Sequence, residues 1–386
     1  MSVTLLQTDA VGMIVWFLMF FVFLFLYPRL MLSQLIYKIE QSARKMEDMS
    51  ESANRMTSKK IGGGKDVKKS VDQFTEFFVV EPSNIDPYGL VQKIDQTIRG
   101  MEDRFDEFVD EIAPDKSKQE KQEINYALRA AIGLKQLSKM VRHFVELAKK
   151  FKNLQIAMIL QMQMPIIEKI AEGEYRGTEA FANGWPIGDS IGPLVAASYI
   201  DKEKQIAKDI VMGEASIEGR KCFVLKATGP SPHLGRIDEA MNAIMAKNEI
   251  ARVITIDAAQ KLEGEKSGAV AEGVGFAMGG IGQRELIENV LLPKKMPIDS
   301  IVVKVGMTEA IMPMKKEVYN SLPKARTLVE KAVKRAKKGG KVIIIGVGNS
   351  SGIGNNKKEV EKVKKVVDEL DKKYKKEKEK SKGGWM

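Results

Sequence analysis

The feature that most constrains this chain is an uncharged apolar run near its start. Residues 10–28 carry no charge and are rich in Phe, Leu, Val and Met. With residues 30–32, the run can cross the roughly 30 Å hydrocarbon layer of a membrane as a helix, and Arg29 can reach the headgroups. A cleaved signal peptide is the alternative, but no basic residue precedes the run and no small-residue cleavage site follows it. We therefore predict one transmembrane helix over residues 10–32.

Charge on the two sides of this run predicts its orientation. Only Asp9 precedes the run. Four basic residues follow it closely: Arg29, Lys38, Arg44 and Lys45. Because basic residues stay on the cytoplasmic side, we expect residues 1–9 to lie outside and the body of the protein to lie in the cytoplasm. The single cysteine, Cys222, excludes an internal disulfide and fits a reducing compartment.

Residues 33–172 are predicted to form a cytoplasmic helical region with a flexible joint near residues 61–70, where three consecutive glycines occur. Apolar residues spaced three or four apart predict a buried helix over 88–112. Further helices are expected over 119–150 and 154–170. The segment 154–165 is apolar enough for a second span, but its three glutamines and its proline favour a buried or self-associating helix. A homo-oligomer is therefore among the expected partners.

After Glu172, glycine becomes frequent and short β-rich runs alternate with helical patterns. Strands are predicted over residues 221–225, 252–256, 300–305 and 341–347. Helices are predicted between them over residues 194–212, 235–247, 283–291 and 323–338. This alternation predicts an α/β domain over 173–356, with a mixed or mostly parallel sheet covered by helices on both faces. Residues 357–386 are expected to form a Lys-rich helical tail.

The chain is basic, with a net charge of +11. Its tail, from Lys357 onward, holds 12 Lys against seven Asp or Glu. A basic excess suits nucleic acid or an anionic membrane surface. We expect no nucleic-acid partner, because the tail lacks interleaved aromatic residues and is rich in acids. The chain has only two histidines, which leaves little scope for a histidine-based metal site.

Two aspartates stand where this kind of sheet places its ligands, at the carboxyl ends of strands. Asp189 lies in a glycine-rich bend, residues 188–193 (GDSIGP), which is suited to the start of a helix. Asp257 directly follows the apolar strand 252–256, where an unpaired buried charge is costly. Two aspartates brought together share a proton and can polarise water for amide hydrolysis. The alternative for each is that it caps a helix.

Two glycine-rich segments accompany these aspartates, at residues 273–282 and 346–354. The spacing of the second does not match a dinucleotide-binding fingerprint, and no phosphate-binding Lys-Ser pair follows it. Cys222 lies within an apolar strand and His233 has no evident catalytic partner, so both are interpreted as structural.

Taken together, these segments resemble the germination protease of spore-forming bacteria and its relatives. Residues 188–195 (GDSIGPLV) are similar to that family's G-D-x-L-G-P-x-V segment, and residues 252–258 (RVITIDA) to its strand ending in I-D-A. Residues 275–284 and 301–306 are similar to its glycine-rich loop and the strand after it. Hydrogenase maturation endopeptidases share this fold, so the resemblance implies a phosphorylase/hydrolase-like sheet.

The resemblance also implies a changed order of strands. In the protease family a strand ending in G-x-G-N directly precedes the G-D-x-L-G-P segment, whereas no good strand precedes Asp189 here. Instead, residues 341–349 (KVIIIGVGN) close the domain. We hypothesise a circular permutation in which this strand places Asn349 beside Asp189. A structure with the strand far from Asp189 would contradict the hypothesis.

By the resemblance, Asp189 and Asp257 are the catalytic pair for hydrolysis of a peptide bond. Contacts to the substrate backbone through N–H groups are expected from four further residues: Ser190, Gly279, Gly280 and Asn349. The maturation enzymes use a histidine in recognising nickel, and no histidine follows Asp257 in this chain. No metal and no cofactor are therefore expected.

The whole layout, one span followed by helices and this domain, resembles an archaeal membrane-anchored family of unknown function. The sequence thus predicts a single-pass cell-membrane protein whose cytoplasmic body is a peptidase acting on proteins or peptides. The alternative is non-enzymatic, a tethered scaffold that binds a peptide or small anion and oligomerises through its helical region. The separation of the two carboxylates and their access to solvent distinguish these hypotheses.

Overall fold

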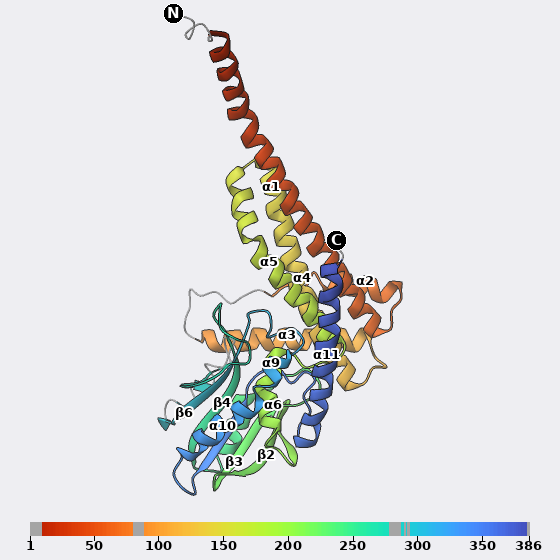
Figure 1. Cartoon of the computed structure of the whole chain (residues 1–386). Coiled ribbons are helices and arrows are strands. Elements are labelled where there is room, and N and C mark those ends of the chain that lie inside the picture. The colour runs from red at the N-terminus through yellow and green to blue at the C-terminus, as the bar shows by residue number, and fades with distance from the viewer. Residues whose placement is uncertain (1–9, 80–88, 278–286, 289–290, 292–293, 384–386) are drawn as a thin grey trace, which may run out of the picture. The chain divides into compact units, whose positions relative to one another are not determined.

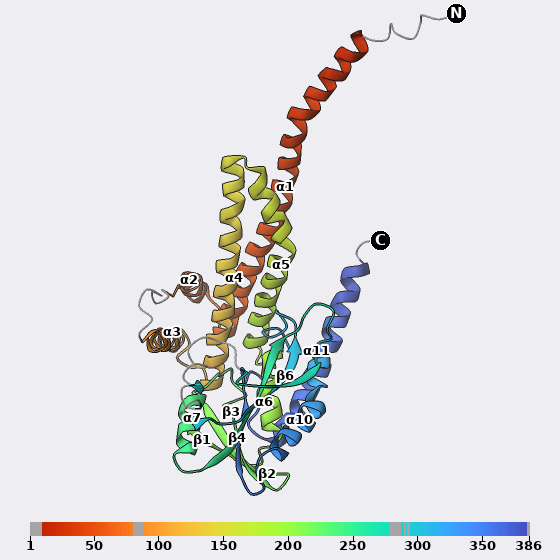
Figure 2. The ribbon, with the colours of Figure 1, turned by 90° about the vertical axis from the view of Figure 1, so that its left-hand side faces the viewer.

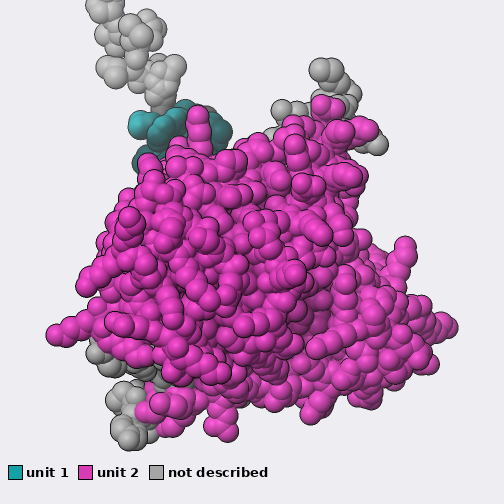
Figure 3. Space-filling view, turned by 90° about the horizontal axis from the view of Figure 1, so that it is seen from below, with its two compact units in different colours: residues 1–52, 133–172 teal, residues 53–132, 173–386 magenta. Residues whose placement is uncertain are grey.

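The computed structural model describes residues 10–79, 89–277, 287, 288, 291 and 294–383, and the chain divides into two compact units (Figure 3). The first unit comprises the residues up to Ser52 together with 133–172. The second comprises 53–132 together with the residues from Gly173 onward. Three helices contribute residues to both units: α1 (Ala10–Ile61), α4 (Lys118–Phe151) and α5 (Leu154–Ala182).

In the first unit, α1 packs beside the antiparallel pair α4 and α5 (Figures 1 and 2). The buried side chains recur every three or four residues along each helix, as an amphipathic pattern requires. They are Ile39, Ala43 and Met46 on α1, Val141, Val145 and Ala148 on α4, and Ala157, Leu160 and Met164 on α5. Polar contacts add to this apolar interface, because the Arg142 guanidinium contacts Glu40 at 2.8 Å and Glu47 at 2.7 Å.

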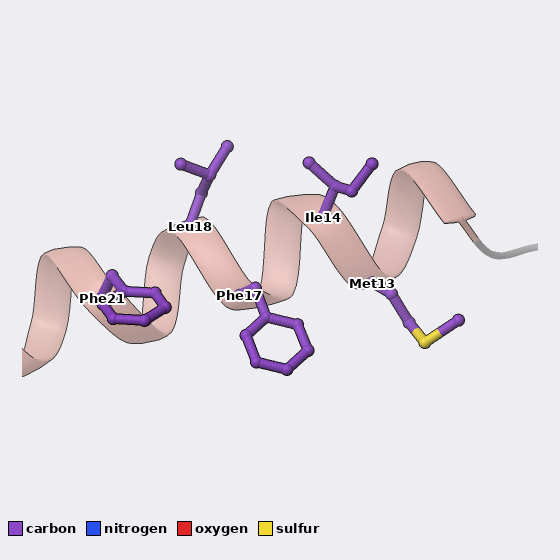
Figure 4. A pocket seen from close by; sticks show the side chains of 5 residues that line it. All are labelled: Met13, Ile14, Phe17, Leu18 and Phe21. Carbon is purple, nitrogen blue, oxygen red and sulfur yellow. The ribbon is translucent and has the colours of Figure 1, made fainter.

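The first part of α1 is long and apolar enough to cross a membrane, as predicted. Every residue from 12 to 30 is exposed. Five of these side chains project from the helix around a shallow apolar hollow (Figure 4): Met13, Ile14, Phe17, Leu18 and Phe21. A single helix that is exposed on all sides and carries no charge before Arg29 suits a lipid environment better than water.

The second unit begins with a small helical cluster. The helix α2 (Lys65–Phe74) follows α1 after three glycines with positive φ, at the position of the predicted joint. Its Phe74 ring stacks on Phe108 of α3 (Leu90–Ile112), with 3.7 Å between the ring centroids. The beginning of α4 completes this core through Ile124 and Leu128. Of the helix expected over 88–112, the described part runs from Leu90 to Ile112, and Phe105 and Val109 of its apolar stripe are buried.

A seven-stranded mixed sheet forms the centre of the second unit, in the order β1-β2-β3-β7-β4-β6-β5. The strands β3, β7, β4 and β6 run parallel, and β1, β2 and β5 add antiparallel edges. Their bounds are β1 Glu203–Ala207, β2 Ile210–Ile217, β3 Arg220–Ala227, β4 Ile250–Gln260, β5 Val270–Val274, β6 Ile298–Val305 and β7 Lys341–Gly346. The predicted α/β class with a mixed sheet is confirmed.

Helices cover both faces of this sheet. One face packs against α6 (Ile191–Ala197), α10 (Leu322–Lys334) and α11 (Lys357–Gly383) through a large apolar cluster. The other face packs against α7 (Ile237–Met245) through residues such as Phe223, Leu225 and Ile343. Two short helical segments complete the described elements, a 3-10 turn η1 (Gly188–Ser190) and α9 (Lys316–Tyr319).

The predicted helix over 194–212 is wrong. The helix α6 ends at Ala197, and the rest of that range forms β1 and the start of β2. A turn follows the helix directly at residues 198–199, and Asp209, with φ of 55°, then reverses the chain between the two strands. The strand β5 was also not predicted. Most of the predicted helix 283–291 lies outside the described residues.

Candidate active site

The glycine-rich bend that carries Asp189 lies on the carboxyl edge of the parallel strands. It forms η1 and leads directly into α6, which contacts both β4 and β7. Gly192 lies so close to these strands that a Cβ atom there would be 2.1 Å from the carbonyl oxygen of Val347 and 2.4 Å from that of Ile256. No other residue fits this approach, so the glycine fixes the position of the bend on the sheet edge.

Asp189 is held by backbone groups from two separate loops. Its carboxylate Oδ2 accepts a 2.7 Å hydrogen bond from the backbone N–H of Asn349, and its own N–H donates to the carbonyl of Ala310 at 2.8 Å. The side chain is half-buried. Burial raises the pKa of Asp189 to about 6, and the Asn349 N–H opposes that rise because it stabilises the charged form. This carboxyl therefore holds its proton closer to neutral pH than an ordinary aspartate does.

Asp257 belongs to β4, whose pairing with β6 continues as far as Gln260. The pairing of β4 with β7 ends at Ile256, the residue before Asp257. There the Val347 N–H donates to the Ile256 carbonyl at 2.8 Å. Asp257 is 6% exposed, and its Oδ1 accepts a 2.7 Å hydrogen bond from the N–H of Ala258. It thus lies just past the point where β7 leaves the ladder, rather than after the last residue of its strand as predicted.

The loop after β7 connects the two aspartates. Val347 is hydrogen-bonded to the residue before Asp257, and Asn349 is hydrogen-bonded to Asp189. Gly348 between them has φ of +116°, and a Cβ there would lie 2.3 Å from the Asp189 carbonyl oxygen. The adjacency of Asn349 and Asp189 that the permutation hypothesis requires is present in the structure.

The other predicted substrate-binding residues have different surroundings. Ser190 is fully buried, and its hydroxyl donates to the Ser351 carbonyl at 3.1 Å and accepts from the Ile187 N–H at 3.3 Å. The Ser190 N–H, the group expected to bind substrate, donates to the Ile187 carbonyl at 3.0 Å. Asn349 is 4% exposed, and its Oδ1 accepts a 2.9 Å bond from the Ser351 N–H. Gly279 and Gly280 lie outside the described residues.

A buried lysine at the same sheet edge was missed from sequence. Lys226 near the end of β3 is fully buried, and its Nζ donates to the Ala227 carbonyl at 2.6 Å and to Asn355 Oδ1 at 3.0 Å. Burial lowers the pKa of Lys226 to about 7. The available signal was a lysine inside an otherwise apolar strand pattern, Cys222–Ala227.

A loop from residue 306 to 314 also closes around the aspartate bend. The Gly188 N–H donates to Met312 at 3.1 Å, and Met314 donates back to Pro186 at 2.7 Å. These contacts have no local sequence signal.

Cys222 is fully buried, as its structural interpretation requires, and burial raises the pKa of its thiol to about 11. Among the residues the structure describes, no three His, Cys, Asp or Glu side chains gather closely enough to hold a metal ion.

Comparison with known proteins identifies two adjoining family domains. Residues 13–184 match the domain described as "Protein of unknown function (DUF1512) N-terminal domain". Residues 187–354 match "Domain of unknown function (DUF1512) C-terminal", which contains both aspartates and Asn349. No curated protein and no solved structure matches the chain. The resemblance to the germination protease accordingly stays a prediction.

Proposed function

We propose that this chain, which belongs to the DUF1512 family and contains both of its domains, is a membrane-anchored peptidase. Asp189 and Asp257 are its proposed catalytic pair. The observation that carries the proposal is the hydrogen bond between the Asn349 N–H and Asp189 Oδ2. Together with the bond between Val347 and Ile256, it assigns both acids to one edge of the sheet.

The two carboxyl groups differ in a way that suits acid–base work. Asp189 is half-buried with a pKa raised to about 6 by burial, so it can donate a proton to a substrate carbonyl at mildly acidic to neutral pH. Asp257, through its carboxylate, acts as the base that takes a proton from the attacking water. The water oxygen then bonds to the carbonyl carbon and the amide C–N bond breaks. The leaving amine takes the water-derived proton from Asp257, and the new carboxyl group returns a proton to Asp189.

The anchor is the second part of the proposal. The exposed apolar stretch of α1 supplies one membrane span, and the basic residues after it favour a cytoplasmic body. In this arrangement the peptidase domain works close to the inner surface of the cell membrane. Its substrates are then membrane proteins or peptides produced at that surface.

The experiment is peptide cleavage by the full chain in lipid nanodiscs, followed by mass spectrometry on a mixed peptide pool. We expect Asp189→Asn and Asp257→Asn each to reduce cleavage by about 10²-fold or more. The matched control is Asp201→Asn, an exposed aspartate that pairs with Lys357 on the surface. Equal cleavage by the wild type and both site variants would remove the proposed mechanism.

One observation favours the non-enzymatic alternative. The N–H groups of Ser190 and Asn349, which were expected to bind a substrate backbone, already donate to the Ile187 carbonyl and to the Asp189 carboxylate. A scaffold that binds a peptide or small anion has no need of a proton-donating carboxyl. In the same assay, peptide binding without cleavage in any variant would support the scaffold.

A further inference from the structure

The turn between α4 and α5 carries a group of lysines and a capped helix start. Phe151 ends α4, Lys152 adopts φ of 48°, and Asn153 caps α5. The Asn153 Oδ1 accepts hydrogen bonds from the N–H groups of Gln155 at 2.8 Å and Ile156 at 3.1 Å. The side chain of Asn153 thus satisfies the first donors of α5 and makes the turn tight.

The level of this turn along α1 follows from burial. The face of α1 that is buried at Ile39 and Ala43 continues as half-buried residues at 31, 32, 35 and 36, and it ends there, because residues 12–30 are all exposed. Lys149, two residues before the end of α4, forms an ion pair with Glu40. That contact holds the pKa of Glu40 down at about 2, with Arg142 adding to the effect.

These contacts put the turn at the boundary of the apolar segment. From Lys149 the helix α4 rises only about 3 Å further to Phe151, at 1.5 Å per residue. The backbone of α4 therefore ends within about two residues of Glu40 along α1, and the half-buried residues at 31, 32, 35 and 36 lead from that level to the uncovered apolar stretch, which begins at residue 30. Both ribbon views show the α4–α5 turn beside α1, with the apolar part of α1 continuing beyond it (Figures 1 and 2).

The chemistry of the tip matches a membrane surface. Phe151 is 61% exposed, and the Lys150 Nζ lies 5.6 Å from the centre of its ring. Between Glu146 and Glu168 the chain has three lysines and no acidic residue. Aromatic rings settle at the headgroup level of a bilayer, and lysines there are attracted to anionic lipids.

We propose that the α4–α5 turn is a second membrane contact, in which Phe151 and the neighbouring lysines bind the anionic headgroups of the cytoplasmic leaflet beside the α1 span. The proposal rests on the α1 anchor of the proposed function and is independent of peptidase activity. The contact fixes the first unit against the bilayer at two points instead of one.

The test uses the full chain with an environment-sensitive fluorophore on single introduced cysteines, in a Cys222→Ala background. Gln155→Cys reports the tip, Gln136→Cys reports a point about 22 Å further down α4, and Leu24→Cys reports the span itself. The chain is reconstituted into phosphatidylcholine vesicles with or without phosphatidylglycerol. Quenching is measured with acyl-chain-labelled lipids for residue 24, with headgroup-labelled lipids for residues 136 and 155, and with aqueous iodide.

We expect lipid-borne quenching at 155 and at 24 and none at 136, with stronger quenching at 155 in anionic vesicles. The double variant Lys150→Gln/Lys152→Gln should lower the ratio of membrane-bound to unbound turns about 30-fold. Each basic residue near an anionic surface raises the binding constant by about a factor of five. The matched pair Lys135→Gln/Lys139→Gln should leave the signal at 155 unchanged.

Three outcomes would overturn the proposal and tell its failures apart. Quenching at 24 with none at 155 means that the anchor holds but the tip does not touch the membrane. Absence of lipid quenching at 24 means that the anchor itself fails. Protection of 155 from iodide without lipid quenching points to a protein partner, such as a second copy of this chain, in place of the membrane.

Discussion

Asp189 and Asn349, 160 positions apart in the chain, are joined by a 2.7 Å hydrogen bond from the Asn349 backbone N–H to Oδ2 of Asp189. The bond brings a helix start and the loop after a central strand to one point on the sheet edge. It also sets the electrostatics there, because a single backbone donor only partly offsets the burial of the carboxyl group. The behaviour of Asp189 with pH is therefore the first consequence to test.

The first prediction concerns the pH profile of peptide cleavage. The folded-state pKa of Asp189 is raised to about 6, so the proton it donates is present below that pH and lost above it. We expect kcat/KM of the full chain to fall about tenfold per pH unit above roughly pH 6, because kcat/KM reports the free enzyme. A profile that stays flat from pH 5 to 8 is incompatible with Asp189 as the acid.

The second prediction concerns the bend on the sheet edge. A Cβ at Gly192 would meet two carbonyl oxygens at 2.1 and 2.4 Å, both on rigid strand ends. We expect Gly192→Ala to destabilise the second unit by about 3 kcal/mol or more through overpacking. The control is Gly100→Ala, in an exposed part of α3 with open space around it, where we expect about 1 kcal/mol of stabilisation. Urea unfolding of both variants measures the difference, and equal midpoints would contradict the steric account.

The third prediction concerns Lys226. Its folded-state pKa, lowered by burial to about 7, lies below the usual 10.5, so the folded protein binds fewer protons than the unfolded chain between these values. Stability should therefore rise with pH above 7, by up to about 1.4 kcal/mol per unit from this group. Lys226→Met should remove that rise.

The matched control for Lys226 lies on the same strand. Lys221 is about half exposed and pairs with Glu214 at 2.7 Å. In Lys221→Met the pH dependence should persist. Urea midpoints at pH 7, 8 and 9 measure it, and a wild type with constant midpoints would show that Lys226 is charged in the folded state.

The fourth prediction concerns the docking of α3. Arg236, just before α7, is 5% exposed and contacts Asp95 at 3.0 Å and Glu102 at 2.8 Å on α3. Arg236→Met leaves two carboxylates without their buried partner, which costs about 3–5 kcal/mol. Hydrogen exchange should show faster opening of α3. Arg104→Met removes an arginine that is 61% exposed from the same helix and should change exchange little.

Much of the sheet was predictable because its central strands are continuous apolar runs. The strands β3, β4 and β7 each contain a continuous buried apolar run, whereas β6 also carries polar residues and half-buried positions such as Val302 and Lys304. The edge strand β1 was not predictable in this way, since Glu203, Lys204 and Gln205 are exposed and carry no apolar signal. It forms because it pairs with β2, and that partnership is not visible in a local pattern.

The candidate site, too, was only partly predictable from the sequence. Asp189 stood out because glycines flank it, and Asn349 because its loop follows an apolar strand with similar glycines. The loop contact from Ala310 to Asp189 and the burial of Ser190 depend on packing between distant segments. Lys226 was overlooked because lysines are rarely buried, and only its contacts with Ala227 and Asn355 explain how this one is accommodated.

The proposed peptidase mechanism requires that Asp189 and Asp257 share a proton. The most direct measurement is a carboxyl-carbon NMR titration of Asp189, with selectively labelled aspartate, in the wild type and in Asp257→Asn. We expect an Asp189 pKa of about 6 in the wild type. If the two acids share a proton, the pKa should be lower in the variant, because a second carboxylate close by raises the pKa of the first. An Asp189 pKa that is the same in both proteins would contradict the pairing.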